Sequence, residues 1–454
     1  MSFESINPTT GESLGTYPEH DAQEVEARIQ RVWNGWQRWS LAPLSERTAF
    51  LTRLAELLEE RVEEYARLIT LEMGKPIGEA RGEVKKAASG ARHFAENGTA
   101  YIQSEAIPGT PGRVVYQSIG PILAIMPWNL PFWQVLRFFI PTALVGNTVI
   151  VKHAESVQGC ALAIEKVVHD AGGSNIYVNL SVQTKVVPSI IADKRVRAVT
   201  VTGSVRAGRA VAELAGVHGK KVVLELGGSD PFIVLEDADV AKAVQLGVTS
   251  RYSNNAQSCI AAKRFLIAEP IADAFIKAFV KQSAALKMGD PLQADTKLGP
   301  QARKDLLDKS ARQVRDAVAA GARVLLGGEP LPGPGYFFPP TVLVGLPPDA
   351  PVAREEFFGP VALISTFKTE DEAIQRANDS DFGLGATVCS QNAERANAIA
   401  ARLEAGAVFV NDFVRSDARA PFGGVKASGF GRELGSLGAR ELANAKLIWE
   451  PPTA

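Results

Sequence analysis

The feature that most constrains the fold of this chain is an alternation of short β-branched runs with longer helix-compatible segments. The runs lie at residues 122–126, 148–151, 198–202 and 222–226. Strands that alternate with helices form parallel sheets, because each crossover between parallel strands needs a connection about as long as a helix. The sequence therefore predicts an α/β fold.

A second alternating series begins near Pro231 and continues past Val410, with helices expected at residues 271–286 and 303–320. The chain has 454 residues, which is too long for one compact core and indicates about two or three domains. We expect the boundary between the two series at Gly227-Gly228.

Three segments lie outside both series. Residues 21–95 carry apolar side chains at helical spacing and predict a block of amphipathic helices. Residues 100–116 and 446–449 are strand-like. We expect these two strand-like segments to form a small β arm, and a pair of surface hairpins is the alternative.

Composition excludes several classes of protein. Apolar residues make up 46% of the chain and charged residues 22%, as in ordinary globular proteins, and the net charge of -1 gives no electrostatic case for nucleic acid or an anionic membrane. The amino terminus lacks the basic patch and apolar run of a secretory signal, and no stretch approaches the roughly 18 apolar residues of a membrane span. Cys160, Cys259 and Cys389 lack metal-like spacing, so we expect reduced thiols, no metal and a cytoplasmic location.

Cys259 closes the polar stretch 254–258 and precedes an apolar one. We therefore expect a loop to meet a helix there. A thiol at a helix start is favoured as the thiolate, because the helix dipole and nearby backbone N–H groups stabilise its charge. Taken alone, a buried structural cysteine is the commoner case.

Glu225 and Asn129 each follow a predicted strand. Glu225 ends an apolar run before two glycines, which suggests a functional carboxyl group with a raised pKa, and an exposed acid at the sheet edge is equally compatible. Asn129 lies in a turn stiffened by two prolines, where its amide can stabilise an oxyanion or cap a helix. The turn at Gly203-Ser204 joins a strand to a helix and suits a pyrophosphate, although an ordinary turn has the same pattern.

Together and in this order, these features resemble the aldehyde dehydrogenase superfamily over nearly the whole chain. The short amino terminus and Asn411-Asp412-Phe413 are most similar to its bacterial succinate-semialdehyde dehydrogenase branch. The other motifs that carry the resemblance are Ile6-Asn7-Pro8, Glu72-Met73-Gly74-Lys75-Pro76, Pro127-Trp128-Asn129, Gly203-Ser204, Glu225-Leu226-Gly227-Gly228, Gln257-Ser258-Cys259, Glu356-Phe357-Phe358-Gly359-Pro360 and Pro421-Phe422-Gly423-Gly424-Val425-Lys426.

The resemblance implies two αβ domains with parallel-type sheets, namely a Rossmann-like cofactor domain and a catalytic domain, together with a small β oligomerisation arm. It also implies a homodimer or homotetramer. The expected boundaries are 1–98 and 118–227 for the NAD-binding domain, 228–427 for the catalytic domain, and 99–117 with 428–454 for the arm.

The resemblance also implies the chemistry, which is oxidation of an aldehyde to a carboxylic acid through a thioester. It makes Cys259 the nucleophile, Asn129 the oxyanion donor and Glu225 the base that activates water for hydrolysis. A CoA-acylating dehydrogenase and a catalytically idle family member are alternatives, and the presence of these groups argues against both.

The cofactor that the resemblance implies is NAD, with NADP as a second possibility. A carboxylate at Glu155 would accept hydrogen bonds from the adenosine ribose and repel a 2′-phosphate. The sequence departs from the family pattern at Val201, His153 and Ala256, where phenylalanine, proline and glycine are frequent. The residues implied to bind the cofactor are Trp128, Lys152, Glu155, Gly203, Ser204, Glu356 and Phe358.

For the substrate, the resemblance implies that Arg137, Ser416 and Phe422 contact it, with Arg137 holding a distal carboxylate. We expect succinate semialdehyde, and another short aliphatic or ω-carboxylated aldehyde is the alternative. A structural salt bridge from Arg137 to an acid of the chain is the competing interpretation of that residue. A second arginine of the branch is replaced by Ser253, and the expected substitutes are Arg251, Arg415 or Arg419.

Overall fold

The β-branched runs of the first series form one sheet, as expected. In a computed structural model that describes residues 2–450, six strands lie in the order β19-β9-β8-β5-β6-β7, and all are parallel except β19. Their bounds are β5 (Pro121–Ile125), β6 (Thr148–Lys152), β7 (Tyr177–Asn179), β8 (Ala198–Thr202), β9 (Lys221–Glu225) and β19 (Gly429–Phe430).

Both faces of this sheet are covered by helices, which explains why its strands are apolar throughout. Ile122 and Val149 face one apolar core, and the next residues, Leu123 and Ile150, face the other. The first core contains α2 (Leu44–Glu60), α3 (Val62–Met73), α4 (Ile77–Tyr101), α5 (Trp133–Val145) and α6 (Gln158–Asp170). The second contains α1 (Ala22–Trp39), α7 (Val187–Ala192) and α8 (Val205–Val217), so the predicted helical block is confirmed.

The second series forms a seven-stranded sheet in the order β12-β13-β14-β11-β10-β16-β17, in which only β12 is antiparallel. The strands are β10 (Asp230–Val234), β11 (Ala262–Ala268), β12 (Arg323–Leu326), β13 (Thr341–Val344), β14 (Val361–Phe367), β16 (Gly385–Cys389) and β17 (Ala407–Val410). Helices α9 (Val240–Tyr252) and α10 (Ala272–Ala284) pack on one face, and α12 (Glu370–Asn378) and α13 (Ala393–Ala400) pack on the other, while α11 (Lys304–Ala319) shares a core with β13 and β14.

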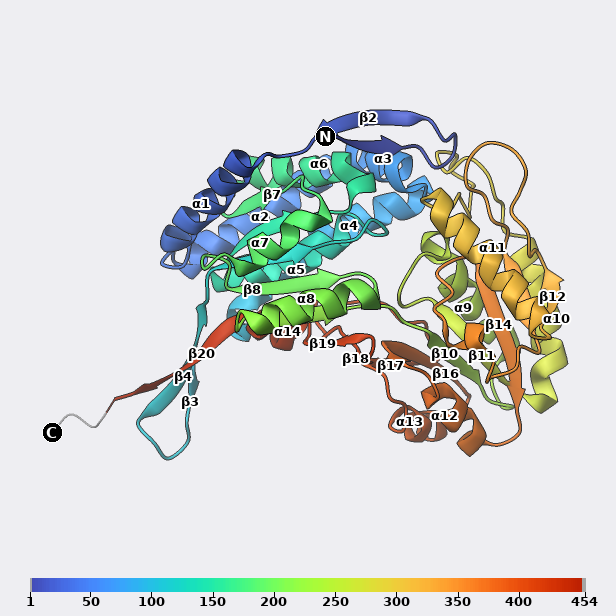
Figure 1. Cartoon of the computed structure of the whole chain (residues 1–454). Coiled ribbons are helices and arrows are strands. Elements are labelled where there is room, and N and C mark those ends of the chain that lie inside the picture. Colours follow the sequence, from blue (N-terminus) through green and yellow to red (C-terminus); the bar gives the residue numbers. More distant parts are fainter. Residues whose placement is uncertain (1, 451–454) are drawn as a thin grey trace.

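The two sheets form separate lobes, and the chain passes from one to the other between β9 and β10 (Figure 1). This crossing lies at the predicted boundary Gly227-Gly228, because β9 ends at Glu225 and β10 begins at Asp230. The α/β architecture expected from the sequence is therefore confirmed. In the described part of the chain, every helix is too short or too polar to span a bilayer.

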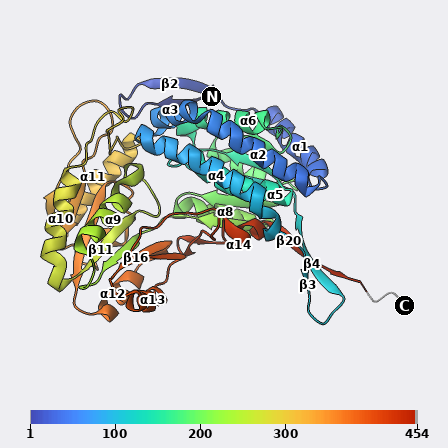
Figure 2. The same ribbon diagram turned by 180° about the vertical axis from the view of Figure 1, so that it is seen from behind.

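A three-stranded antiparallel sheet projects from the first lobe (Figures 1 and 2). Its order is β20-β4-β3, with β3 (Glu105–Ala106), β4 (Gly112–Ser118) and β20 (Ala443–Trp449). The segment expected to be strand-like from residue 100 instead begins as the last turn of α4, which continues to Tyr101. Residues 428–442 also differ from the expected arm, because β19 pairs with β9 and α14 (Gly435–Glu441) packs on α4 and α5.

Candidate active site

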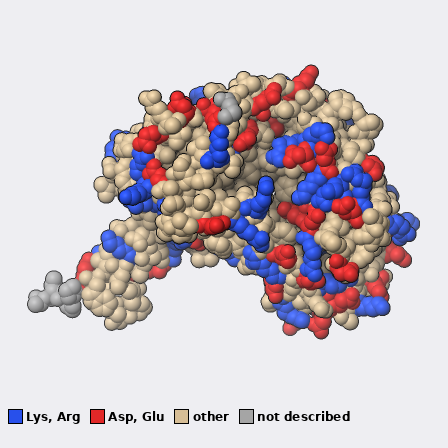
Figure 3. Space-filling view, in the orientation of Figure 1, with Lys and Arg blue, Asp and Glu red and all other residues tan. Residues whose placement is uncertain are grey.

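The loops at the carboxyl ends of the first sheet open into a large cavity between the lobes. This is where ligands bind in parallel α/β sheets, because the loops there diverge to the two faces. The cavity has a volume of about 1090 Å³ and takes lining residues from both lobes. Figure 3 shows the molecule hollowed between the lobes, with basic side chains near the rim. Those that line the cavity include Arg206, Arg303, Lys304 and Lys309.

All seven residues expected at a dinucleotide line this cavity. Trp128 and Phe358 meet at 5.9 Å between ring centroids, and Lys152 is 3.6 Å from the carboxylate of Glu155. The full set is Trp128, Lys152, Glu155, Gly203, Ser204, Glu356 and Phe358.

The groups that line the cavity fit a nicotinamide dinucleotide. Ser204 is the N-cap of α8, and its Oγ accepts from the Ala207 N–H at 3.2 Å, so the start of that helix faces the cavity. Such a helix start binds pyrophosphate through its free N–H groups. The buried hydroxyls of Ser156 and Thr202 also line the cavity and make no hydrogen bond within residues 2–450.

Cys259 lies in a turn that precedes β11, so the expected helix start at this position is wrong. The residues after the cysteine enter the middle of the second sheet, where β11 pairs with β10 and β14. The turn is held from inside by two buried cations. Arg251 donates to the carbonyls of Ala256 (2.6 Å) and Ala262 (3.1 Å), and Lys263 donates to the Cys259 carbonyl at 2.5 Å.

Residues 254–256, shortly before this turn, have an uncommon backbone conformation. Asn254, Asn255 and Ala256 have φ values of 58°, 54° and 61°, in the left-handed region that asparagine tolerates and alanine does not favour. The Asn255 amide donates to the carbonyls of Gly74 (2.7 Å) and Pro300 (2.9 Å) and accepts from a main-chain N–H. These bonds fix a conformation that would otherwise relax.

Cys259 is partly exposed as a residue, but its thiol lies deep enough that burial raises its pKa to about 12. The charges of Lys263 and Arg137 oppose this effect. The thiol is therefore protonated at neutral pH, contrary to the thiolate expected for a helix start, and attack on a carbonyl requires a base.

Glu225 lines the same cavity as Cys259 and is the last residue of β9. It is 2% exposed, and its carboxylate accepts no hydrogen bond within residues 2–450. Burial and, next, the charge of Glu433 hold its pKa well above the usual range. The raised pKa expected from the sequence is confirmed, and such a carboxylate is a strong base when it is ionised.

Asn129 follows β5 and is buried against the cysteine loop. Its Nδ2 donates to the Gln257 carbonyl at 2.9 Å, and its Oδ1 accepts from Gln134 at 3.2 Å. The alternative role as a helix cap is wrong, because Glu83 accepts from the first N–H groups of α5. The amide has a second hydrogen, which leaves one donor for an oxyanion on the Cys259 side of the cavity.

A second cavity of about 190 Å³ also reaches Cys259. Arg137, Ser416 and Phe422, the three residues expected at the substrate, all line it. Ser416 Oγ accepts from Lys86 Nζ and Trp133 Nε1, each at 2.9 Å. Cys259 therefore has a large cavity on one side and a small cationic cavity on the other.

Arg137 is buried and forms an ion pair with Glu433, which agrees with the competing interpretation of this residue as a structural salt bridge. Its guanidinium also lies 4.6 Å from the centre of the Phe422 ring. Glu433 and Phe422 are joined by two main-chain hydrogen bonds of 2.7 Å, so Arg137 contacts both residues of one bridge.

None of the three substitutes expected for the missing arginine lines the small cavity, and those expectations are wrong. Arg251 instead donates to the Ala256 carbonyl and holds the loop before Cys259. The exposed Arg415 and Arg419 form ion pairs with Asp412 and Asp417, respectively. Besides Arg137, the basic residues that do line it are Lys86 on α4 and Lys75, which is in a buried ion pair with Glu83. Sequence reasoning missed Lys86 and Glu433 because each is placed by contacts distant in sequence, and it missed Lys263 although its partners Ser258 and Cys259 are close in sequence.

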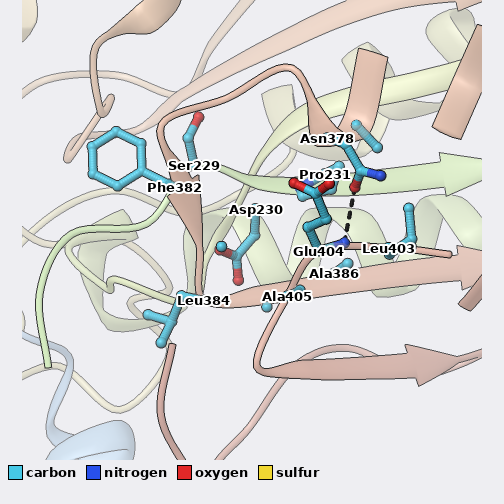
Figure 4. Close-up of a pocket in the computed structure, with 13 residues that line it drawn as sticks. Ser229, Asp230, Pro231, Asn378, Phe382, Leu384, Ala386, Leu403, Glu404 and Ala405 are labelled. Atoms are coloured by element: carbon cyan, nitrogen blue, oxygen red, sulfur yellow. Dashed lines mark hydrogen bonds between the residues drawn. The ribbon is translucent and has the colours of Figure 1, made fainter. Parts of the chain in front are cut away.

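A third pocket, at the beginning of β10, is too small for a substrate. It has about 10 Å³ between Asp230, Leu384 and Glu404 (Figure 4), which is room for about one water molecule. Burial raises the pKa of Asp230 to about 7. The described residues contain no cluster of side chains that would hold a metal ion.

Fold and site together define an α/β protein in which a cysteine lies between a dinucleotide-sized cavity and a small cationic one. The chain belongs to the aldehyde dehydrogenase family, whose model matches residues 1–448. It is therefore an enzyme that oxidises aldehydes with a nicotinamide dinucleotide.

Relatives of known activity and a solved structure match the chain over nearly its full length. The succinate semialdehyde dehydrogenase [NAD(P)+] Sad of Escherichia coli is 48% identical, covering 98% of this chain and 97% of its own. The succinate-semialdehyde dehydrogenase [NADP(+)] of Deinococcus radiodurans is 44% identical, covering 99% and 95%. The crystal structure of the succinic semialdehyde dehydrogenase from Streptococcus pyogenes with NADP+ superposes with a TM-score of 0.97 at 37% identity, covering 99% and 100%.

Proposed function

We propose that this enzyme oxidises succinate semialdehyde to succinate through a thioester on Cys259. The observation that carries the proposal is the cationic cavity that shares Cys259 with the cofactor-sized cavity. An aldehyde with a carboxylate at its far end would place its carbonyl at the thiol and its negative charge among these cations. The three relatives compared above are named for this substrate.

In the proposed mechanism, the Cys259 thiol loses its proton to solvent and attacks the aldehyde carbon. The Asn129 amide and the Cys259 main-chain N–H stabilise the oxyanion of the resulting thiohemiacetal. A bound nicotinamide would supply the hydride acceptor, and loss of hydride from the thiohemiacetal would leave a thioester on Cys259. Glu225 then deprotonates the water that hydrolyses the thioester and releases the acid.

Hydrolysis is favoured over transfer to coenzyme A by the position of Glu225. A buried carboxylate with a raised pKa, in the same cavity as the thiol, is suited to activate water. We expect free succinate as the product even when coenzyme A is present, which product analysis by chromatography would test.

We propose NAD as the preferred cofactor and NADP as a weaker one. Lys152, Glu155, Ser204 and Glu356 would hold it, with Trp128 and Phe358 beside the nicotinamide end. The half-exposed Glu155 carboxylate would repel a 2′-phosphate, while Lys152 and Arg206 in the same cavity reduce that repulsion. Two of the relatives carry NADP(+) in their names, so the preference is expected to be modest.

The domain roles follow the two lobes in this proposal. Residues 1–98 and 118–227 bind the cofactor, 228–427 supply the nucleophile, and the β arm joins copies into a homodimer or homotetramer. The exposed Leu447 and Trp449 on β20 suit such an interface. The three free cysteines suit a cytoplasmic enzyme.

A panel of aldehydes and cofactors tests the proposed function. Succinate semialdehyde, glutarate semialdehyde and butanal are each assayed with NAD and with NADP. We expect the highest kcat/KM for succinate semialdehyde with NAD. A kcat/KM for butanal equal to that for succinate semialdehyde would contradict the proposed substrate, and equal efficiency with NADP would contradict the proposed cofactor.

A further inference from the structure

The small cavity beside Cys259 has three basic side chains, and two of them are in ion pairs. Lys75 forms a buried ion pair with Glu83, and Arg137 forms one with Glu433. A buried charge that is paired in this way attracts a further ion less than an unpaired one does, because its partner offsets part of its field. The charge of Arg137 still acts on Cys259 and Lys86, and its Nη2 has no hydrogen-bond partner within residues 2–450.

Lys86 is the third basic residue, and within residues 2–450 it has no ion-pair partner. Its ammonium donates to Ser416 Oγ at 2.9 Å and lies 4.7 Å from the centre of the Trp133 ring. The other acid that lines the cavity, Glu79, accepts from the Asn254 main-chain N–H at 2.6 Å. Lys86 is thus a desolvated cation that faces an indole and a hydroxyl.

We propose that Lys86 is the anchor for the distal carboxylate of the substrate, with Ser416 and Trp133 holding its ammonium in place. This inference rests on the proposed function, and it makes Lys86 the unpaired cation that meets the carboxylate, beside Arg137 in the same cavity. A carboxylate in the cavity would supply the counterion that Lys86 lacks. The Ser416 hydroxyl, which accepts from Lys86 and Trp133, still has its own hydrogen to donate to that carboxylate.

The pKa of Lys86 makes its proposed role dependent on pH. Burial, and next the charge of Arg137, lower the pKa of Lys86 to about 8, while Glu83 and Asp417 oppose the shift and Arg415 adds to it. Above that pH the amine loses its charge and no longer attracts a carboxylate. The KM for succinate semialdehyde should therefore rise above about pH 8, while the KM for an uncharged aldehyde should not follow the same curve.

The test compares Lys86→Met with Lys85→Met, a matched control in which an exposed lysine one position earlier on α4 is changed. Each variant is assayed with succinate semialdehyde and with butanal, which has the same chain length without the carboxylate. We expect Lys86→Met to raise KM for succinate semialdehyde about tenfold or more with a smaller change in kcat. Butanal kinetics and the Lys85→Met variant should stay near wild type, and Lys86→Arg should recover part of the loss.

Two results would contradict the proposal that Lys86 anchors the distal carboxylate. One is a Lys86→Met enzyme that keeps the wild-type preference for succinate semialdehyde over butanal. The other is an equal loss on both aldehydes in a variant whose thermal unfolding is unchanged. The wild-type panel separates this failure from that of the proposed function, because a wild type without any preference for the carboxylated aldehyde contradicts both.

Discussion

Arg137 on α5 and Glu433 form a buried ion pair beside the nucleophile, between the cavity that reaches Cys259 and the end of β9. Both side chains are at most 4% exposed. The pair is a structural element of the site as well as part of its electrostatics. It links the helix after Asn129 to Glu433, which is also the main-chain hydrogen-bond partner of Phe422.

Breaking this pair from one side should destabilise the protein. Arg137→Leu leaves the Glu433 carboxylate buried without its partner, and we expect a loss of about 3–5 kcal/mol in the free energy of unfolding. Adding Glu433→Leu should recover most of it, because the double variant contains no uncompensated charge. Urea unfolding measures both, and an unchanged midpoint for Arg137→Leu would show that the pair contributes nothing.

Glu433 should also set the pH at which Glu225 acts as a base. Its charge raises the pKa of Glu225, so Glu433→Gln should lower that pKa. A general base works when it is deprotonated, and the rising limb of thioester hydrolysis against pH should therefore move to lower pH. Stopped-flow turnover across pH tests this, with Glu12→Gln at the exposed amino end as a control. A limb that stays in place or moves to higher pH would refute it.

Ala256 should be more tolerant of glycine than its neighbours. Its φ of 61° disfavours a Cβ, whereas Ala261, on the other side of Cys259, has no such conformation. Both are buried, so either change to glycine removes one buried methyl group. We expect Ala256→Gly to be about 1 kcal/mol more stable than Ala261→Gly. Denaturant unfolding of the two variants decides it, and equal stabilities would mean that the turn is not strained.

His153 should make the stability of the protein depend on pH. Its Nε2 contacts the Pro131 carbonyl at 3.0 Å, its Nδ1 accepts from the Ala154 N–H, and burial lowers its pKa to about 4. The unfolded chain, with an ordinary histidine pKa near 6.5, takes up a proton first as the pH falls. The contribution of roughly 3 kcal/mol is thus complete above about pH 6.5 and is lost as the pH falls toward 4.

The variant His153→Gln should lose part of this pH dependence. Urea unfolding of wild type and variant at pH 7 and pH 5 gives the comparison. If the free energy of unfolding falls equally between these two pH values in both proteins, the neutral buried histidine is not its cause.

The parts of the site that the sequence predicted are those set by local structure. Asn129, Lys152, Ser204 and Glu225 each follow an apolar run, and the carboxyl ends of parallel strands must meet at one sheet edge. The division into two alternating series likewise follows from where the apolar runs begin and end.

The rest depends on contacts that no local pattern contains. The turn at Cys259 was expected to begin a helix because apolar residues follow it, but β11 is a buried strand whose apolar character comes from its neighbours in the sheet. Lys86 and Ser416 are 330 residues apart and meet only because α4 and the segment before Phe422 line one cavity. The Glu433 partner of Arg137 is equally remote in sequence.

The central claim is that the acid is formed on Cys259 and released by Glu225. The most direct measurement uses Glu225→Gln, mixed with NAD and succinate semialdehyde, quenched in acid within the first turnover and analysed by peptide mass spectrometry. The account predicts about one NADH per active site followed by slow turnover, with a succinyl thioester on the peptide that contains Cys259. A burst of NADH with Cys259 unmodified, or an acyl group on another residue, would contradict it.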